Sequence, residues 1–332
     1  MDITTLKQTA QAMVASAKGI LAADESSKTI QKRFDSLGIE CTEESRLSYR
    51  QMLFTTPGVE EFLSGIILFD ETIRQKTMDG VLIPKLLEDK GVIPGIKVDK
   101  GVWALPNFPG EKVAEGLDGL RDRLIEYKEV GACFAKFRAT IQIGDKIPTD
   151  TCIDANAEVL ARYAALCQEQ DIVPVVEPEV LLDGGHTIEE CFEAQVRTLK
   201  KVFERLKAHK VVMEGMILKP SMVLSGKDCP TQADSKTVAK MTVDALKQSV
   251  PAEVGGIAFL SGGQSDESAV ENLAEINKIN GPWPLTFSYS RGLQNAPMKI
   301  WGGKAENVKA AQDEFYSRCQ RVSLARQGKL RS

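Results

Sequence analysis

The sequence predicts an α/β chain folded as a single-domain (β/α)8 TIM barrel, and three observations carry that prediction. Short apolar runs recur along the chain, mostly about 40 residues apart, and Gly or Pro bounds several of them. Stretches with a helical spacing of apolar residues fill the intervals between these runs. No shift in composition marks a linker, so we expect one domain over residues 1–332.

Eight apolar runs are the expected barrel strands. A doubly wound open sheet is the alternative arrangement of such units, but no G-x-G-x-x-G fingerprint follows the first run. We therefore favour the closed barrel. In chain order the runs span residues 19–23, 65–69, 94–98, 132–137, 172–176, 215–218, 256–260 and 285–287.

The clearest helix is expected to begin at Thr187. Thr187 and Glu190 have the spacing of a capping box, and the apolar residues that follow lie on one helical stripe. Further helices are predicted over residues 156–167, 237–246 and 267–279. Strand and helix thus alternate, as a barrel requires.

Composition and charge exclude several classes of protein. A net charge of −4 argues against sequence-independent binding of nucleic acid or of an anionic membrane. No apolar stretch is long enough to span a bilayer, and the first residues lack a signal peptide's apolar core. The seven scattered cysteines, without a C-x-x-C pair, suit reduced thiols. We therefore expect a cytoplasmic protein.

The two histidines, His186 and His209, favour neither zinc nor histidine catalysis. A catalytic zinc site usually takes two or three imidazoles, and His209 has no acidic or thiol companion nearby in the sequence. Neither histidine has a context typical of a Ser-His-Asp triad. We expect catalysis without a metal.

Polar residues follow nearly every apolar run. Because the carboxyl ends of barrel strands converge on one mouth, these residues are expected to lie close together, with a solvated rim as the alternative. They are Asp24, Asp70 or Glu71, Lys97 with Asp99, Lys136 with Arg138, Glu177 with Glu179, Lys219, Ser261, and Ser288 with Arg291.

Lys219 and Lys136 are the candidate nucleophiles. They follow strands two apart in order, and alternate strands contribute inward residues to a common layer. Burial and mutual repulsion would push one amine toward neutrality, and a neutral amine can attack a ketone to form an iminium ion. A lysine that reaches the surface from a strand end is the alternative for Lys219 taken alone.

Three carboxylates are candidates for proton transfer. Glu177 and Glu179 flank Pro178, so in an extended chain they point to the same side. Iminium formation needs an acid to expel water, and Asp24 is a separate carboxylate suited to a substrate hydroxyl. The alternative for each is a simple ion pair, which we favour slightly for Glu179 and not for Glu177 or Asp24.

Two segments are suited to binding anions. Ser261-Gly262-Gly263-Gln264-Ser265 lies between an apolar run and a helical stretch, and Ser288-Tyr289-Ser290-Arg291 closes the last run. A second anion would bind near residues 24–28 with Lys32, Arg33 and Lys97. Charge on a helix surface is the alternative for Lys32.

Many segments of the chain resemble the class I (Schiff-base) fructose-1,6-bisphosphate aldolases. They are GILAADES (19–26), GIKVDKG (95–101), GLDGL (116–120), FAKFR (134–138), IVPVVEPE (172–179), MILKPSMV (216–223), FLSGGQS (259–265), TFSYSR (286–291) and WGGK (301–304).

The resemblance implies a barrel, no cofactor, and reversible cleavage of fructose 1,6-bisphosphate to dihydroxyacetone phosphate and glyceraldehyde 3-phosphate. It makes Lys219 the Schiff-base lysine and Glu177 the general acid–base residue. It has Asp24 contacting the hydroxyl at the bond to be cleaved, and Lys136 assisting. It also implies a homo-oligomer, a tetramer or a dimer. The residues expected to bind substrate or its phosphates are Ser26, Arg33, Lys97, Arg138, Ser261, Gly262, Ser288, Ser290 and Arg291.

Two departures from the family pattern stand out. Ser290 occupies a position where the family usually has glycine, so phosphate affinity or sugar-length preference is expected to differ. The sequence ends at residues 327–332 without the tyrosine-ended tail of animal enzymes, so we expect that another acid exchanges the enamine proton, that exchange is slower, or that the sequence was trimmed at this end. The rival functions are a transaldolase or one-phosphate aldolase, and a phosphosugar-binding protein without catalysis.

Overall fold

The computed structural model describes residues 1–330, and it confirms the predicted closed barrel. Arg331 and Ser332, at the end of the expected short tail, lie outside the described residues. Eight parallel strands close in the order β1-β10-β9-β8-β7-β6-β3-β2. Their bounds are β1 Gly19–Ala23, β2 Leu63–Leu68, β3 Ile93–Lys97, β6 Phe134–Ile141, β7 Val173–Val180, β8 Ile217–Leu218, β9 Gly256–Phe259 and β10 Leu285–Tyr289.

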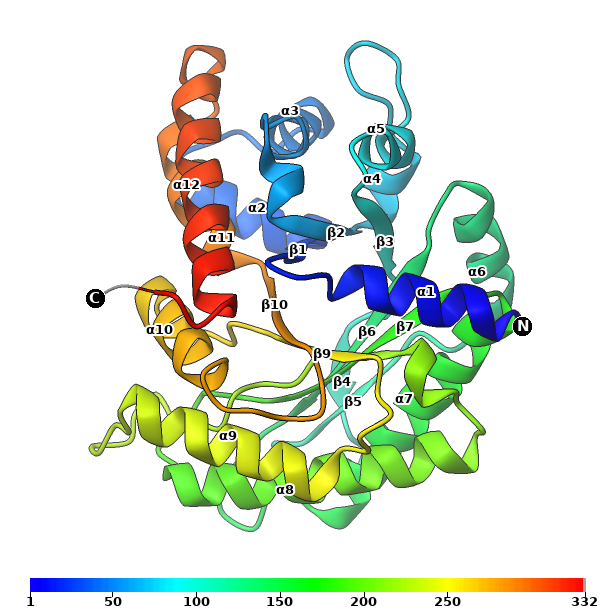
Figure 1. The fold of residues 1–332 in the computed structure, drawn as a ribbon, viewed down its shortest axis with the longest axis vertical. Helices are drawn as coiled ribbons and strands as arrows, with labels where there is room; N and C mark the ends of the chain where they lie inside the picture. Colours follow the sequence, from blue (N-terminus) through cyan, green and yellow to red (C-terminus); the bar gives the residue numbers. More distant parts are fainter. Residues whose placement is uncertain (331–332) are drawn as a thin grey trace.

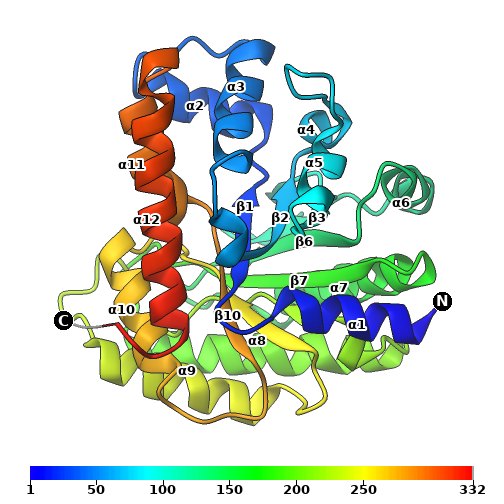
Figure 2. The ribbon, with the colours of Figure 1, turned by 45° about the horizontal axis from the view of Figure 1, so that its top comes forward.

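Helices surround the barrel, as Figure 1 and Figure 2 show. The α-helices are α1 Ile3–Met13, α2 Ser27–Asp35, α3 Glu43–Phe54, α4 Asp70–Arg74, α5 Ile83–Asp89, α6 Leu120–Glu129, α7 Asp150–Glu169, α8 Ile188–Ala208, α9 Ser235–Ser249, α10 Asp266–Ile276, α11 Arg291–Trp301 and α12 Val308–Arg326. Short 3-10 helices are η1 Val59–Glu61, η2 Met213–Gly215 and η3 Ala305–Asn307. A hairpin of β4 Val102–Ala104 and β5 Lys112–Ala114 follows β3.

The four predicted helices correspond to α7, α8, α9 and α10. The capping box at Thr187 is confirmed, because the Thr187 side chain accepts from the N–H of Glu190 while Glu190 accepts from the N–H of Thr187. Helix α7 begins six residues before the predicted start, where Thr149 caps it. Within residues 1–330, no helix combines the length and apolarity that crossing a membrane requires.

Strands β6 and β7 each run four residues beyond the predicted ends. Arg138, Glu177 and Glu179 were expected to follow these strands, but they lie within them, and Arg138 is in register with Glu177. All residues of β7 are buried. A run of apolar residues reveals only the apolar part of a strand. Strands β6 and β7 continue beyond that part into charged residues, so the predicted ends were too early.

The barrel interior is apolar at one end and charged at the other. Helix α1 covers the apolar end, in front of the strands in Figure 1. The inner core consists of Leu6, Ala10, Met13, Val14, Ile20, Ala22, Ile67, Phe134, Val173, Val175, Ile217 and Ala258. Side chains of a strand alternate between its two faces. The next inward-facing position on each strand is therefore two residues C-terminal to its last residue in this core. On four strands that position holds Asp24, Lys136, Glu177 and Lys219.

Candidate active site

The carboxyl ends of the barrel strands surround a cavity of about 560 Å³. Thirteen of the predicted site residues line it: Asp24, Ser26, Lys97, Lys136, Arg138, Glu177, Glu179, Lys219, Ser261, Gly262, Ser288, Ser290 and Arg291. Arg33 is the exception. Asp70 also lines the cavity, whereas Glu71 pairs with Arg46 and Arg50.

Glu177 lies between the two candidate lysines. Its Oε1 is 3.1 Å from Nζ of Lys219, and its Oε2 is 3.4 Å from Nζ of Lys136. The side chains of all three residues are about 95% buried. The two lysines therefore share a carboxylate, which offsets the direct repulsion that we expected between them.

Lys136 lies within 4 Å of three carboxylates. Its Nζ lies 2.7 Å from Oδ2 of Asp24 and 3.7 Å from Oδ2 of Asp99, in addition to its contact with Glu177. Burial opposes the charge of the ammonium group, but these three carboxylates outweigh burial and hold the pKa of Lys136 well above its usual range. Lys136 is thus a fixed ammonium group.

Asp24 is held ionised by its neighbours. Burial alone would raise the pKa of its carboxyl, but Lys136, Lys219 and Lys97 lower that pKa to about 2. Asp24 is therefore a buried carboxylate that can accept a hydrogen bond or a proton from a substrate hydroxyl.

Asp99 belongs to the same network; we expected it at the barrel mouth but assigned it no role in catalysis or substrate binding. It pairs with Lys97, and Lys136 and Lys97 overcome the effect of burial to lower the pKa of Asp99. Burial lowers the pKa of Lys97, against the opposing charge of Asp99. The sequence could have indicated this pairing, since Lys97 and Asp99 are two residues apart and therefore lie on the same side of an extended chain.

Glu179 contacts Arg138 and, among the described residues, none of the lysines. The Nε–H of Arg138 donates to Glu179. Burial opposes the charge of Arg138, but Glu179 raises the pKa of the guanidinium above its usual range. This arrangement favours the ion-pair interpretation of Glu179.

Glu25 also lines the cavity, although the sequence analysis gave it no role of its own. Its Oε1 accepts hydrogen bonds from the hydroxyl of Ser290 at 2.8 Å, from Nε2 of Gln294 at 2.9 Å, and from Arg33. Arg33 also donates to Asn295, and these contacts keep it behind the cavity wall. The φ of Ser290 is −104°, outside the left-handed region, so the backbone does not require glycine there.

The loop after β9 has the form predicted for an anion site. Gly262 and Gly263 have φ of +55° and +86°, and Ser265 caps helix α10. A Cβ at Gly263 would lie 3.7 Å from the guanidinium of Arg291, so the loop and this arginine are neighbours. The buried hydroxyl of Ser288 has no hydrogen-bond partner among the described residues.

The comparisons with known proteins agree with this geometry. The family model described as "Glycolytic: Fructose-bisphosphate aldolase class-I" matches residues 5–332. A probable fructose-bisphosphate aldolase class 1 of Xanthomonas campestris is 56% identical, with 99% of each chain covered. The cytosolic fructose-bisphosphate aldolase 4 of Arabidopsis thaliana is 50% identical over 94% of this chain and 80% of its own.

A solved structure is similar over the whole barrel. It is the fructose-bisphosphate aldolase of Plasmodium falciparum, crystallised with TRAP and a small-molecule inhibitor. The two chains superpose with a TM-score of 0.97 at 46% sequence identity, covering 99% of this chain and 96% of the other. This protein therefore belongs to the class I fructose-bisphosphate aldolase family.

Proposed function

We propose that the protein reversibly cleaves fructose 1,6-bisphosphate to dihydroxyacetone phosphate and glyceraldehyde 3-phosphate, through a Schiff base on Lys219. One observation carries the proposal: a single buried carboxylate, Glu177, contacts both Lys219 and Lys136 in the wall of the cavity. The names of the relatives, which are fructose-bisphosphate aldolases, support this substrate.

Schiff-base formation needs an amine and an acid. Transfer of a proton from Lys219 to Glu177 leaves a neutral amine, whose Nζ lone pair attacks the ketone carbon. The proton that the attacking nitrogen then loses moves to the ketone oxygen, which becomes a hydroxyl. Glu177, which lies within hydrogen-bond distance of Nζ, then protonates the resulting hydroxyl so that it leaves as water. The nitrogen lone pair closes the C=N bond, and the product is an iminium ion.

Cleavage uses the iminium ion as an electron sink. Asp24 accepts the proton of the substrate hydroxyl next to the bond that breaks, and that oxygen forms the aldehyde of glyceraldehyde 3-phosphate. The carbon–carbon bond pair moves into the iminium ion to give an enamine. Lys136, fixed as an ammonium group, stabilises the negative charge that develops beside Asp24. Protonation of the enamine and hydrolysis of the C=N bond release dihydroxyacetone phosphate.

Two groups of residues are proposed to hold the phosphates. Arg291 forms no ion pair among the described residues, so its charge is available to a phosphate at the start of α10, together with Ser261, Gly262 and the hydroxyl of Ser288. The second phosphate would bind across the cavity at Ser26 and Lys97, with Arg33 behind them.

Borohydride trapping tests the proposal. Reduction in the presence of dihydroxyacetone phosphate should add one triose to Lys219 and to no other residue, as peptide mass spectrometry would show. A phosphosugar-binding protein without catalysis would gain no adduct. A transaldolase or one-phosphate aldolase would form the adduct but would prefer fructose 1-phosphate to the bisphosphate.

We also propose that the protein works in the cytoplasm as a homo-oligomer, a tetramer or a dimer. Its relatives in Arabidopsis include two that are named cytosolic, which supports the location. Light scattering coupled to size-exclusion chromatography would give the oligomeric mass, and a monomer at micromolar concentration would contradict the second part.

A further inference from the structure

A second cavity lies on the outside of the barrel, between α3 on one side and α11 and α12 on the other. Its volume is about 550 Å³, and it shares no lining residue with the active-site cavity. Clefts of roughly 300–1,000 Å³ are the size that binds small molecules. The lining residues are Gly38, Ile39, Glu40, Thr42, Glu44, Ser45, Ser48, Gln51, Met52, Thr55, Met78, Trp301, Gly302, Gly303, Ala305 and Val308.

The floor of this cavity is apolar and well packed. Trp301 and Met52 are each 3% exposed. The indole of Trp301 packs 5.4 Å from the ring of Tyr49 and 5.8 Å from that of Phe34, measured between ring centroids. The hydroxyl of Tyr49 in turn bonds to the side chain of Gln294. A floor held in this way is present before any ligand binds.

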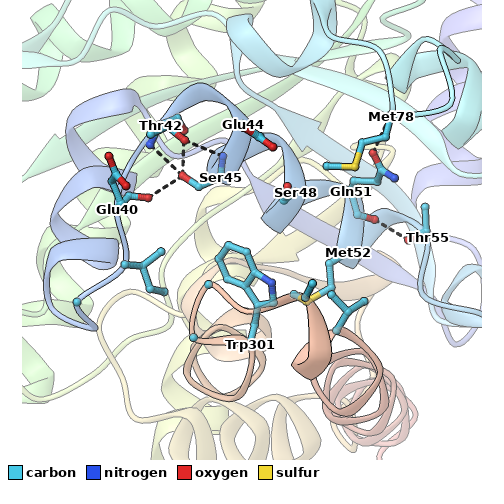
Figure 3. Close-up of a pocket in the computed structure, with 16 residues that line it drawn as sticks. Glu40, Thr42, Glu44, Ser45, Ser48, Gln51, Met52, Thr55, Met78 and Trp301 are labelled. Carbon is cyan, nitrogen blue, oxygen red and sulfur yellow. Dashed lines mark hydrogen bonds between the residues drawn. The ribbon is translucent and has the colours of Figure 1, made fainter.

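One edge of the cavity is acidic. Figure 3 shows the indole of Trp301 at the base, with Glu40 to one side, Glu44 above it, and Met52 and Met78 on the opposite side. Both glutamates are exposed, and neither forms an ion pair within residues 1–330. No lysine or arginine occurs among the described residues that line the cavity.

This distribution of charge favours a positively charged ligand over a negatively charged one. Two carboxylates repel an anion, so a phosphorylated sugar is disfavoured here. The capping box of α3 also uses the N–H groups of Thr42 and Ser45 internally, which leaves fewer donors for an anion at this helix start. A cation gains from both carboxylates, and the apolar floor of Trp301 and Met52 offers its organic part a surface on which to pack.

We propose that this cavity is a second small-molecule site, which binds an organic cation. The apolar, preferably aromatic, body of the cation lies on Trp301, and its ammonium group pairs with Glu40 and Glu44. The inference is independent of the proposed reaction, because the cavity shares no wall with the active site.

Titration of the purified protein with 4-phenylbutylammonium tests the proposal. The chain has three tryptophans, so protein with ¹⁵N-labelled indoles gives three indole N–H signals. Trp103→Phe and Trp283→Phe variants assign the Trp301 signal by elimination. We expect the probe to shift the Trp301 signal alone, with a Kd on the order of 1 mM for a ligand of this size. A shift of all three signals together, or of none, overturns the proposal.

Charge and shape are tested separately. The neutral 4-phenylbutan-1-ol and the anionic 4-phenylbutyrate should bind at least about fivefold more weakly, and E40Q/E44Q should raise the Kd of the cation about tenfold. The control Glu306→Gln removes a nearby charge that does not line the cavity, and it should leave the Kd unchanged. Ser48→Phe, which fills the cavity from α3, should abolish the shift. Equal binding of cation and alcohol, or unchanged binding by E40Q/E44Q or by S48F, contradicts the proposal.

Discussion

The ammonium group of Lys136 lies 2.7 Å from the carboxylate of Asp24, and only 4% of the Lys136 side chain and 11% of the Asp24 side chain are exposed. A buried pair of this kind stabilises the fold only while both members are charged, because an unpaired buried charge is costly. The same pair keeps Asp24 ionised for its proposed role. This contact is therefore expected to contribute both to the stability of the fold and to the proposed activity.

The first prediction concerns stability at low pH. The folded-state pKa of Asp24 is about 2, against an ordinary value of 3.8. Because the folded pKa is depressed, the stabilisation from Asp24 is fully present above about pH 4 and is lost as the pH falls through about 2. This contribution is about 2 kcal/mol. Urea unfolding from pH 4 to pH 2 should therefore show a steeper loss for the wild type than for Asp24→Asn, and parallel curves would contradict the assignment.

The second prediction separates the chemistry of Lys219 from its packing. Lys219→Met removes the amine and leaves a side chain of similar length in the barrel. We expect kcat to fall at least about 10⁴-fold, since the covalent route is lost, while the thermal unfolding temperature stays within a few degrees. The control Lys200→Met, on the exposed surface of α8, should keep full activity. Substantial turnover by K219M would remove Lys219 from the mechanism.

Most residues of the active-site cavity were predictable, because the carboxyl ends of all eight strands of a barrel lie at the same face. Residues at the ends of eight apolar runs had to converge, and thirteen of the expected site residues do line one cavity. The extents of β6 and β7 were not predictable from apolar runs, since both strands include charged residues: Arg138, which is half-buried, and Glu177 and Glu179, which are buried.

Other features depend on contacts between residues far apart in the chain. Glu25 meets Ser290 at a sequence separation of 265, where the end of β1 lies beside the start of α11. No local pattern marks such a contact. The cavity above Trp301 likewise arises from how α3 packs beside α11 and α12, so neither helix alone indicates it.

The third prediction distinguishes the two glutamates of β7. Glu177→Gln removes the proton donor that contacts Lys219, so kcat should fall by about 10² to 10⁴. Glu179→Gln instead removes the partner of Arg138, and its main effect should be a raised KM with kcat within about tenfold. Steady-state kinetics with fructose 1,6-bisphosphate would measure both. Equal losses of kcat would assign Glu179 a direct role in the chemistry.

The fourth prediction concerns Ser290, whose hydroxyl donates a hydrogen bond to Glu25 in the wall of the active-site cavity. Ser290→Ala removes this donor, while Gln294 and Arg33 still hold the Glu25 carboxylate. A carboxylate with one donor fewer should repel substrate phosphate more strongly, so we expect KM for fructose 1,6-bisphosphate to rise about three- to tenfold at nearly constant kcat.

Ser290→Gly provides the comparison that separates the two effects of the serine. It removes the same hydroxyl but also lets the backbone approach phosphate more closely, so its KM should lie below that of S290A. Because the effect acts through phosphate, the KM for a substrate that lacks the phosphate bound at this end should be unchanged in both variants. Fructose 1-phosphate, fructose 6-phosphate and fructose 1,6-bisphosphate, compared on the same preparations, would measure this difference, because one of the two monophosphates lacks the phosphate bound near Ser290. A fall in kcat without a change in KM would instead place Ser290 in the chemistry of bond cleavage.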